Sequence, residues 1–186
     1  MGRLLYSMIV SLDGYIEDSN GNFDWGEPGE DLHTYINDLE SRTEILMYGR
    51  NLYEVMSVWE RMENLEVQPD YIKDYSRIWK RKQKMVFSKS LESCTTDSTI
   101  LKKDFIASEI KMIKKNTKGD ISIGGAALAS SALAMNLIDE IILFILPVII
   151  GSGKKWIKDV NMNGLQLVET KSFENNELMV RYQIPN

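Results

Sequence analysis

The sequence predicts an α/β fold, a three-layer sandwich whose mostly parallel central sheet ends in an antiparallel C-terminal hairpin. Strand-like and helix-like segments alternate four times along the chain, a pattern typical of parallel sheets with helices on their faces. Two strand-like segments then follow each other directly, and such neighbours pair as a hairpin. The 186 residues suffice for one buried core, so we predict a single domain over residues 1–186.

The N-terminal part of the chain supplies a strand, a loop and a helix. Residues 4–10 (LLYSMIV) are largely apolar and predict a strand, and the Gly-, Asn-, Asp- and Pro-rich residues 13–29 predict a loop. A helix follows, for which Asp31 is a plausible N-cap. Its apolar residues recur at helical spacing and are Leu32, Tyr35, Ile36 and Leu39.

The middle of the chain predicts two further strands, each next to amphipathic helices. Residues 44–49 (EILMYG) predict a strand that leads into one helix, whose apolar side would consist of Leu52, Val55, Met56 and Trp59. A second amphipathic helix follows Pro69 and is marked by Tyr71, Tyr75, Ile78 and Trp79. Residues 84–88 (KMVFS) predict a strand, and residues 105–115 predict a helix with Ile106, Ile110 and Ile113 on one face.

The C-terminal third contains the most apolar strand and the hairpin. Residues 120–125 (DISIGG) predict a strand, residues 126–136 a helix, and residues 139–151 a strand too apolar to be anything but buried. Two final strands, residues 165–173 and residues 178–184, flank the turn ENNE. This hairpin predicts the antiparallel end of the sheet.

The charge balance argues against a nucleic-acid or membrane partner. The formal net charge is −5, so an anionic polymer or membrane surface would not attract the molecule as a whole. The basic run at residues 77–84 has apolar partners at helical spacing, which favours a solvated helix face over a nucleic-acid site. The most apolar run, residues 141–150, is interrupted by Pro147 and is half a membrane span at most. We therefore predict a soluble cytoplasmic protein.

Cysteine and histidine occur once each, which excludes several kinds of site. Cys94 can form no disulfide within the chain, and an ordinary thiol in a reducing cytoplasm is its expected state. Because His33 is the single histidine, a metal site with two or more imidazoles is excluded, and we predict no metal ion. The run GSGKK at residues 151–155 lacks the spacing of a phosphate-binding P-loop and predicts a turn after the apolar strand.

Three strand-to-helix corners are the candidate binding residues, because ligands of parallel sheets lie beyond the carboxyl ends of the strands. At Gly124–Gly125, glycines before a helix suit either close packing or a phosphate on the helix start, and the corner alone does not decide between them. At Gly49–Arg50, a cation at a helix start opposes the helix dipole, which favours an anion-binding role. Ser88–Lys89 is a weak signal alone, but three such corners suit an extended ligand with several phosphates.

Candidates for acid–base chemistry cluster in the segment DWGEPGEDLHTY. They are Asp24, Glu27, Glu30, Asp31 and His33. Asp31 lies one turn before Tyr35, at the edge of the buried face, so its carboxylate could line a cleft, with N-capping as the alternative. His33 shares a polar side of the helix with Asn37 and Glu40, and we expect this side to be solvated.

Four motifs, taken in order, resemble the dihydrofolate-reductase-like fold: SLDGYI, YGRNLYE, FSKSL and the run from IGGAAL to PVIIGSG. More narrowly, they resemble stand-alone proteins related to the reductase domain of the bacterial bifunctional riboflavin-biosynthesis deaminase/reductase. The resemblance extends from about Leu4 to Tyr182. It implies that the chain binds NADPH and transfers hydride to a small heterocycle or a sugar-derived imine.

The resemblance also implies roles for particular residues. It assigns the adenosine-side phosphates of the cofactor to Gly49, Arg50 and Asn51, and the 2′-phosphate region to Ser88 and Lys89. It assigns the pyrophosphate to Gly124, Gly125, Ala126, Ala127 and Leu128. Positions that flank the nicotinamide match Ile9 and Ile16, and positions on the substrate side match Asp13 and Trp25.

Asp31 is the candidate for proton supply, because an acidic residue opens the corresponding helix of dihydrofolate reductases. Two positions depart from the riboflavin reductases: Ile123 stands where those proteins usually carry Glu, and Ser7 stands where they tend to have Lys. The substrate is therefore left open between a dihydrofolate and a pyrimidine type, and a non-catalytic nucleotide-binding dimer is the alternative function. The family's dimers bury late strands of the sheet, which implies a homodimer.

Overall fold

The structure is a computed structural model that describes residues 1–65 and 67–185. Its largest sheet is built from β1 (Leu4–Ser11), β3 (Thr43–Gly49), β4 (Gln83–Phe87), β5 (Thr99–Lys102), β6 (Asp120–Gly124), β7 (Glu140–Leu146), β9 (Gln166–Ser172) and β10 (Leu178–Gln183). These eight strands lie in the order β5-β4-β3-β6-β1-β7-β10-β9. A separate two-stranded ribbon pairs β2 (Tyr15–Asp18) with β8 (Gly153–Lys155).

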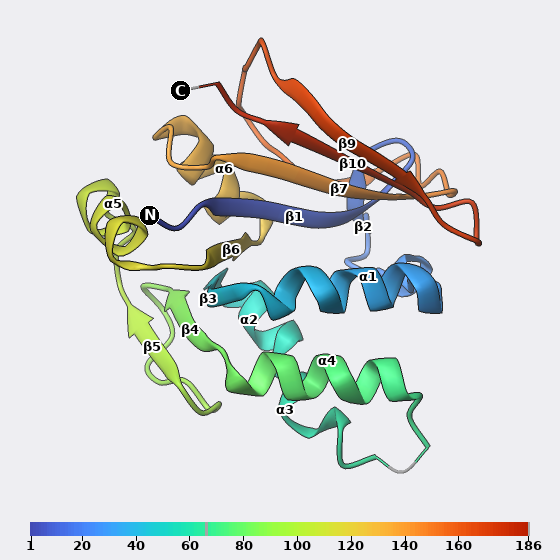
Figure 1. The fold of residues 1–186 in the computed structure, drawn as a ribbon, viewed down its shortest axis with the longest axis horizontal. Coiled ribbons are helices and arrows are strands. Elements are labelled where there is room, and N and C mark those ends of the chain that lie inside the picture. The colour runs from blue at the N-terminus through green and yellow to red at the C-terminus, as the bar shows by residue number, and fades with distance from the viewer. Residues whose placement is uncertain (66, 186) are drawn as a thin grey trace.

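The direction of the strands confirms the predicted fold class. Each pair of neighbours from β5 to β7 is parallel, whereas β10 is antiparallel to both β7 and β9. The C-terminal hairpin of β9 and β10 therefore forms one end of an otherwise parallel sheet. In Figure 1 this hairpin lies at the top of the view, away from β4 and β5.

Helices cover both faces of the sheet. They are α1 (Glu30–Ser41), α2 (Arg50–Met56), α3 (Trp59–Met62), α4 (Asp70–Arg81), α5 (Ala107–Asn116) and α6 (Ala126–Ala134), with a short 3₁₀ helix η1 (Asp24–Gly26). α5 and α6 pack on one face, while α1 and α4 lie side by side on the other (Figure 1). This arrangement is the three-layer sandwich.

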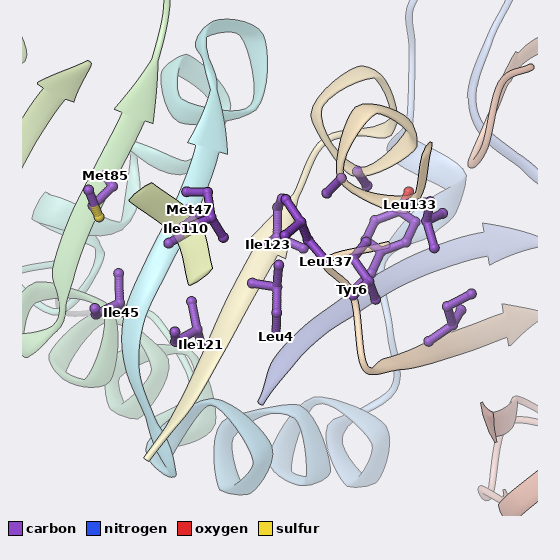
Figure 2. Packing of buried hydrophobic residues seen from close by; sticks show 14 of the residues in the cluster. Leu4, Tyr6, Ile45, Met47, Met85, Ile110, Ile121, Ile123, Leu133 and Leu137 are labelled. Carbon is purple, nitrogen blue, oxygen red and sulfur yellow. The ribbon is translucent and has the colours of Figure 1, made fainter. Parts of the chain in front are cut away.

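The strands alternate their side chains between the two faces, and each face is buried under a layer of helices. Leu4 and Tyr6 of β1 are fully buried under α5 and α6, whereas Ile9 packs on the side of α1. Figure 2 shows the first of these cores, in which Met47 of β3 and Ile123 of β6 meet side chains of the two helices. Both residues are 0% exposed.

One predicted helix is divided in the structure. The helix expected to run through Trp59 ends at Met56, and α3 starts after two intervening residues. Ser57 at the break donates its hydroxyl to the carbonyl of Glu54, a local bond that competes with continuation of the helix. Val55, expected on the buried side, is 42% exposed, and Tyr53 is buried instead.

Three short strands are not predicted by the sequence pattern. β5 is a four-residue edge strand, and β2 and β8 lie in segments predicted as a loop and a turn. The apolar strand β7, by contrast, is shorter than predicted and ends just before Pro147. Proline has no N–H for the ladder, so a strand in the middle of a sheet cannot continue through it.

Candidate functional site

Three corners lie side by side at the carboxyl edge of the sheet. Two of them lead from a strand into a helix as predicted, whereas Ser88–Lys89 opens a loop from β4 to the strand β5, so the prediction of a helix there is wrong. β4, β3 and β6 are neighbours, and their register sets Gly49 opposite Phe87 and Tyr48 opposite Gly124. The three strands therefore end nearly level with one another. The adjacency expected from the sequence is confirmed for the corners Gly49–Arg50, Ser88–Lys89 and Gly124–Gly125.

The Gly124–Gly125 corner combines close packing with an open helix start. A Cβ on Gly124 would lie 2.5 Å from Leu52 Cδ2, so this glycine lets α2 approach β6. Gly125 has a φ of 92°, a conformation that suits glycine, and it is the N-cap of α6. Among the described residues, no side chain caps this nine-residue helix with a hydrogen bond, so its first N–H groups are left to other partners. Packing explains Gly124, and the helix start still offers N–H groups to an anion.

Arg50 connects the corner of β3 with the corner of β4. Its Nε donates to Glu54 Oε1 at 2.7 Å, and its Nη1 donates to Ser90 Oγ at 3.0 Å. Ser90 belongs to the turn after β4, in which Ser88 Oγ accepts the N–H groups of Ser90 and Leu91. The guanidinium thus spans two of the three corners, and its side chain is still 47% exposed.

Lys89 and Asn51 complete the polar groups at these two corners. The Lys89 side chain is 82% exposed, and its Nζ lies 3.3 Å from Asp104 Oδ1. Asn51 is exposed at the start of α2. Because exposed ion pairs contribute little free energy, Lys89 can exchange Asp104 for a ligand phosphate at small cost.

Apolar side chains border the next strand of the edge, β1. Ile9 of β1 packs in an apolar cluster with Trp25 and Val148. Trp25 Nε1 is buried and has no hydrogen-bond partner among the described residues, so this donor is available to a ligand. Ile16 follows in β2 and is half-buried. The carboxyl edge therefore changes from polar at β4 and β3 to apolar at β1.

Asp31 lies inside the first turn of α1, and its predicted N-cap role is wrong. The N-cap is Gly29, whose N–H donates to Glu177 Oε1 at 2.8 Å. Asp31 Oδ1 accepts the N–H of Leu32, and Oδ2 accepts the N–H of Glu174 at 2.8 Å. The turn between β9 and β10 is thereby fastened to the start of α1, a contact across 143 positions that the local pattern could not reveal.

The polar side of α1 is buried, and the prediction that it is solvated is wrong. His33, Asn37 and Glu40 are each 6–7% exposed, because α4 packs beside α1. The His33 ring centroid lies 5.0 Å from that of Tyr71 and 5.7 Å from that of Tyr75. Burial lowers the pKa of His33. The aromatic stripe of α4 is the sequence signal that a second helix could cover this side.

Ile123, immediately before the glycine corner, belongs to the core rather than to the edge. It is 0% exposed and lies in the apolar cluster with Met47 and Ile121. A carboxylate at this position would lose its hydration among apolar neighbours that cannot replace it. The isoleucine found where riboflavin reductases usually carry Glu therefore suits this core.

The basic run after residue 76 is engaged with the chain itself. Arg77 pairs with Asp74 at 2.7 Å, and both Arg77 and Lys80 pair with Glu63. Lys82 donates to the carbonyl of Ser41 at 2.7 Å. The prediction of a solvated helix face holds for Arg77, which is 49% exposed, but it is wrong for Lys84, which lies in β4 and is 0% exposed.

A groove of about 660 Å³ lies away from the corners. It runs beside α5 over the start of β3 and over β4 and β5, and its lining includes Ile45, Met85, Ile100 and Met112. None of the candidate binding or catalytic residues named in the sequence lines it. The corners and the groove are separate features of the fold.

A comparison with protein families matches residues 3–179 to the model of the RibD C-terminal domain. The uncharacterized protein YyaP of Bacillus subtilis (strain 168) is 30% identical over 184 residues, which cover 97% of this chain and 94% of YyaP. These similarities extend over all the corners described above.

Solved structures with the same fold include two of particular relevance. A putative riboflavin biosynthesis protein from Shewanella sp. PV-4 superposes with a TM-score of 0.77 at 18% identity and covers 99% of both chains. A dihydrofolate reductase from Enterococcus faecalis, solved in complex with NADP(H), has a TM-score of 0.66 at 15% identity and covers 100% of this chain and 98% of its own. The predicted dihydrofolate-reductase-like fold is thereby confirmed. No helix of the described residues is long and apolar enough to cross a membrane.

Proposed function

The chain belongs to the RibD C-terminal domain family, and from this membership we propose that it is an NADPH-dependent reductase. The proposed reaction transfers hydride to a C=N or C=O carbon of a small heterocyclic or sugar-derived substrate. The family and its structural neighbours are of the reductase type, and one neighbour was solved with NADP(H).

One observation carries the proposal: three polar corners lie level at the ends of three adjacent strands. An extended dinucleotide needs several anion-binding points in a row, and β4, β3 and β6 supply them. The uncapped start of α6 suits a pyrophosphate, since its N–H groups have no side-chain partner. Arg50 reaches the corner of β4 through Ser90, which suits a phosphate held between these two strands.

The change from polar to apolar along the edge gives the cofactor a direction. In this direction Arg50, Ser88 and Lys89 would bind phosphates at the β3 and β4 corners. Ile9 and Ile16, near the end of β1, would pack against the flat nicotinamide ring. When bound there, NADPH would supply a hydride from C4 of its nicotinamide. The chain's part is to orient that ring, to exclude water with apolar side chains, and to supply a proton.

Asp31 is the proposed source of the proton, directly or through a water molecule. It lies at the start of α1, beside the apolar cluster that contains Ile9 and Trp25. Its two oxygens each accept one backbone N–H, and each retains a further lone pair for a proton or a water molecule. The unpartnered Trp25 Nε1 is the second polar group proposed on the substrate side.

The test of the cofactor assignment is a pair of arginine variants titrated with NADPH and NADH by fluorescence. We expect Arg50→Ala to raise the Kd of NADPH at least tenfold, which is about the loss of one charge-assisted hydrogen bond. The Kd of NADH should rise much less. Arg42→Ala is the matched control. Arg42 is exposed after the last residue of α1, just before β3 begins, whereas Arg50 follows the other end of β3. An equal loss for both cofactors would contradict phosphate recognition by Arg50.

A nucleotide-binding dimer without turnover is the second candidate. The observation in its favour is that both oxygens of Asp31 already accept backbone hydrogen bonds. The two candidates differ in one measurement, NADPH oxidation with a panel of pterins, ribityl-pyrimidines and aldehydes. Thermal stabilisation by NADPH without oxidation of it would favour the binding protein, and no stabilisation at millimolar NADPH would contradict both.

A further inference from the structure

We infer that Asp13 is a positioning residue that fastens the loop after β7 to the turn after β1, and so holds the nicotinamide end of the site in shape. The inference rests on the proposed NADPH site and goes beyond it. Resemblance alone places Asp13 in contact with the substrate, whereas the structure shows its carboxylate bound to the chain's own backbone.

Both oxygens of the Asp13 carboxylate accept hydrogen bonds from nearby groups of the chain. Oδ1 accepts from Ser11 Oγ at 2.7 Å and from the N–H of Ile150 at 3.1 Å, and Oδ2 accepts from the N–H of Gly151 at 2.7 Å. Burial alone would raise the pKa of Asp13, but the hydrogen bonds from Ser11, Gly151 and Ile150 outweigh it and lower the pKa to about 2. At neutral pH the carboxylate is therefore ionised and engaged by three donors.

Further contacts hold the same turn. The N–H of Leu12 donates to the carbonyl of Val148 at 2.8 Å, and Lys155 Nζ donates to the carbonyl of Asp13 at 2.6 Å. Lys155 Nζ also lies 3.7 Å from the ring centroid of Tyr15. Ile150 is 137 positions from Asp13 in the sequence, so the turn joins two distant parts of the chain.

The fastened segments lie at the carboxyl edge, beside the proposed nicotinamide position. β1 and β7 pair in parallel as far as Ser11 and Leu146, so the turn and the loop leave the sheet together. Ile9 precedes the turn and Ile16 follows it in β2. Movement of the turn would shift the two residues proposed to flank the ring. The β3 and β4 corners lie beyond β6 and would not move with it.

Two variants separate this role from a general loss of stability. Asp13→Asn keeps the size of the side chain but turns one oxygen into an NH₂ group, which faces N–H or O–H donors and cannot accept from them. Asp18→Asn is the matched control at the other end of β2, because Asp18 Oδ1 accepts the N–H groups of Asn20 at 2.8 Å and of Asn22 at 2.9 Å.

The first measurement uses the protein without ligand. Amide hydrogen exchange at Ile150 and Gly151, followed by NMR, should become at least tenfold faster in Asp13→Asn and stay unchanged in Asp18→Asn. An unchanged rate in Asp13→Asn would overturn the fastening.

The second measurement compares NADPH with adenosine 2′,5′-bisphosphate, which lacks the nicotinamide half. We expect Asp13→Asn to raise the Kd of NADPH about tenfold and to leave the Kd of the bisphosphate unchanged, since only the nicotinamide end depends on the turn. Equal weakening of both ligands would show a merely structural role and overturn the inference. If the unaltered protein bound neither ligand, the proposed NADPH site would be wrong and the positioning role would fall with it. The exchange rates would still report whether Asp13 fastens the loop.

Discussion

The charged residues at the candidate site each have a partner within the chain before any ligand arrives. Arg50 is held by Glu54 and Ser90, and Asp31 by the N–H groups of Leu32 and Glu174. Such partners fix side-chain geometry, so a ligand that uses these groups meets them already oriented. The residue type indicates which chemistry is available, and the partner decides where it is available.

His33 is the residue whose burial has the clearest consequence for pH. Burial lowers its pKa in the folded protein below the ordinary value of 6.5, and it is the chain's one histidine. Between those two pKa values the unfolded chain binds more protons than the folded one. The free energy of unfolding should therefore fall as the pH decreases below 6.5.

Urea unfolding at pH 7 and pH 5.5 measures this effect. We expect His33→Phe, which keeps an aromatic ring among Trp59, Tyr71 and Tyr75, to lose the part of the pH dependence that lies just below pH 6.5. The wild-type protein is the reference for carboxylates that titrate in the same range. A variant with the same slope as the wild type would contradict a buried neutral histidine.

At the scale of elements, the corner between β6 and α6 is shaped by its contact with α2. Leu52 lies against both glycines, with its Cβ 3.6 Å from the position of a Cβ on Gly125. The helix start available for an anion and the close approach of α2 are therefore properties of one corner. Packing and phosphate binding were alternatives in the sequence, and the structure leaves room for both at this corner.

Substitution of Gly124 tests the packing part of this corner. Gly124→Ala should lower the free energy of unfolding by about 1–3 kcal/mol, because the new Cβ would lie 2.5 Å from Leu52 Cδ2. In a Leu52→Ala background the same substitution should cost less, since the contact is gone. Urea unfolding of the four proteins measures the difference.

Gly49→Ala is the control at the neighbouring corner. Its Cβ would lie 3.9 Å from Leu128 Cβ, an ordinary contact, and the φ of −77° accepts alanine. We expect the free energy of unfolding to change by less than about 0.5 kcal/mol. A cost for Gly124→Ala that is independent of Leu52 would contradict the packing explanation.

At the scale of the whole molecule, the edge strand β9 exposes apolar side chains to solvent. β9 pairs only with β10, and its adjacent residues Leu167 and Val168 are 56% and 53% exposed. The pairing with β10 shifts register at this point, and both apolar side chains remain more than half exposed. An exposed apolar edge strand favours association, and we propose that β9 lies in the homodimer interface.

Light scattering of the purified protein tests this assembly. We expect a dimer at micromolar concentration, and a shift to monomer when Leu167 and Val168 are both replaced by lysine. Ile100→Lys is the control, because Ile100 is 41% exposed on β5, at the other edge of the sheet. A wild-type monomer, or a dimer disrupted by Ile100→Lys instead, would contradict the assignment of β9.

The alternation of elements and the position of the three corners were predictable because both are local. Periodicity identifies a strand or a helix from neighbours in the sequence, and parallel strands bring their ends to one edge whatever their lengths. The same locality explains the errors. One apolar stripe on α1 could not show that α4 would cover the opposite side, and the polar strands β2 and β8 had no periodic signal.

By itself, the sequence determined the fold class, the order of its longer strands and helices and the corners that carry polar groups. Only the tertiary structure decided that Asp13 meets Gly151, that Asp31 meets the hairpin turn, and that His33 is buried. These partners lie far apart in the chain or on another helix. Hydrogen bonding and burial depend on distance in space, which a pattern of nearest neighbours in sequence does not contain.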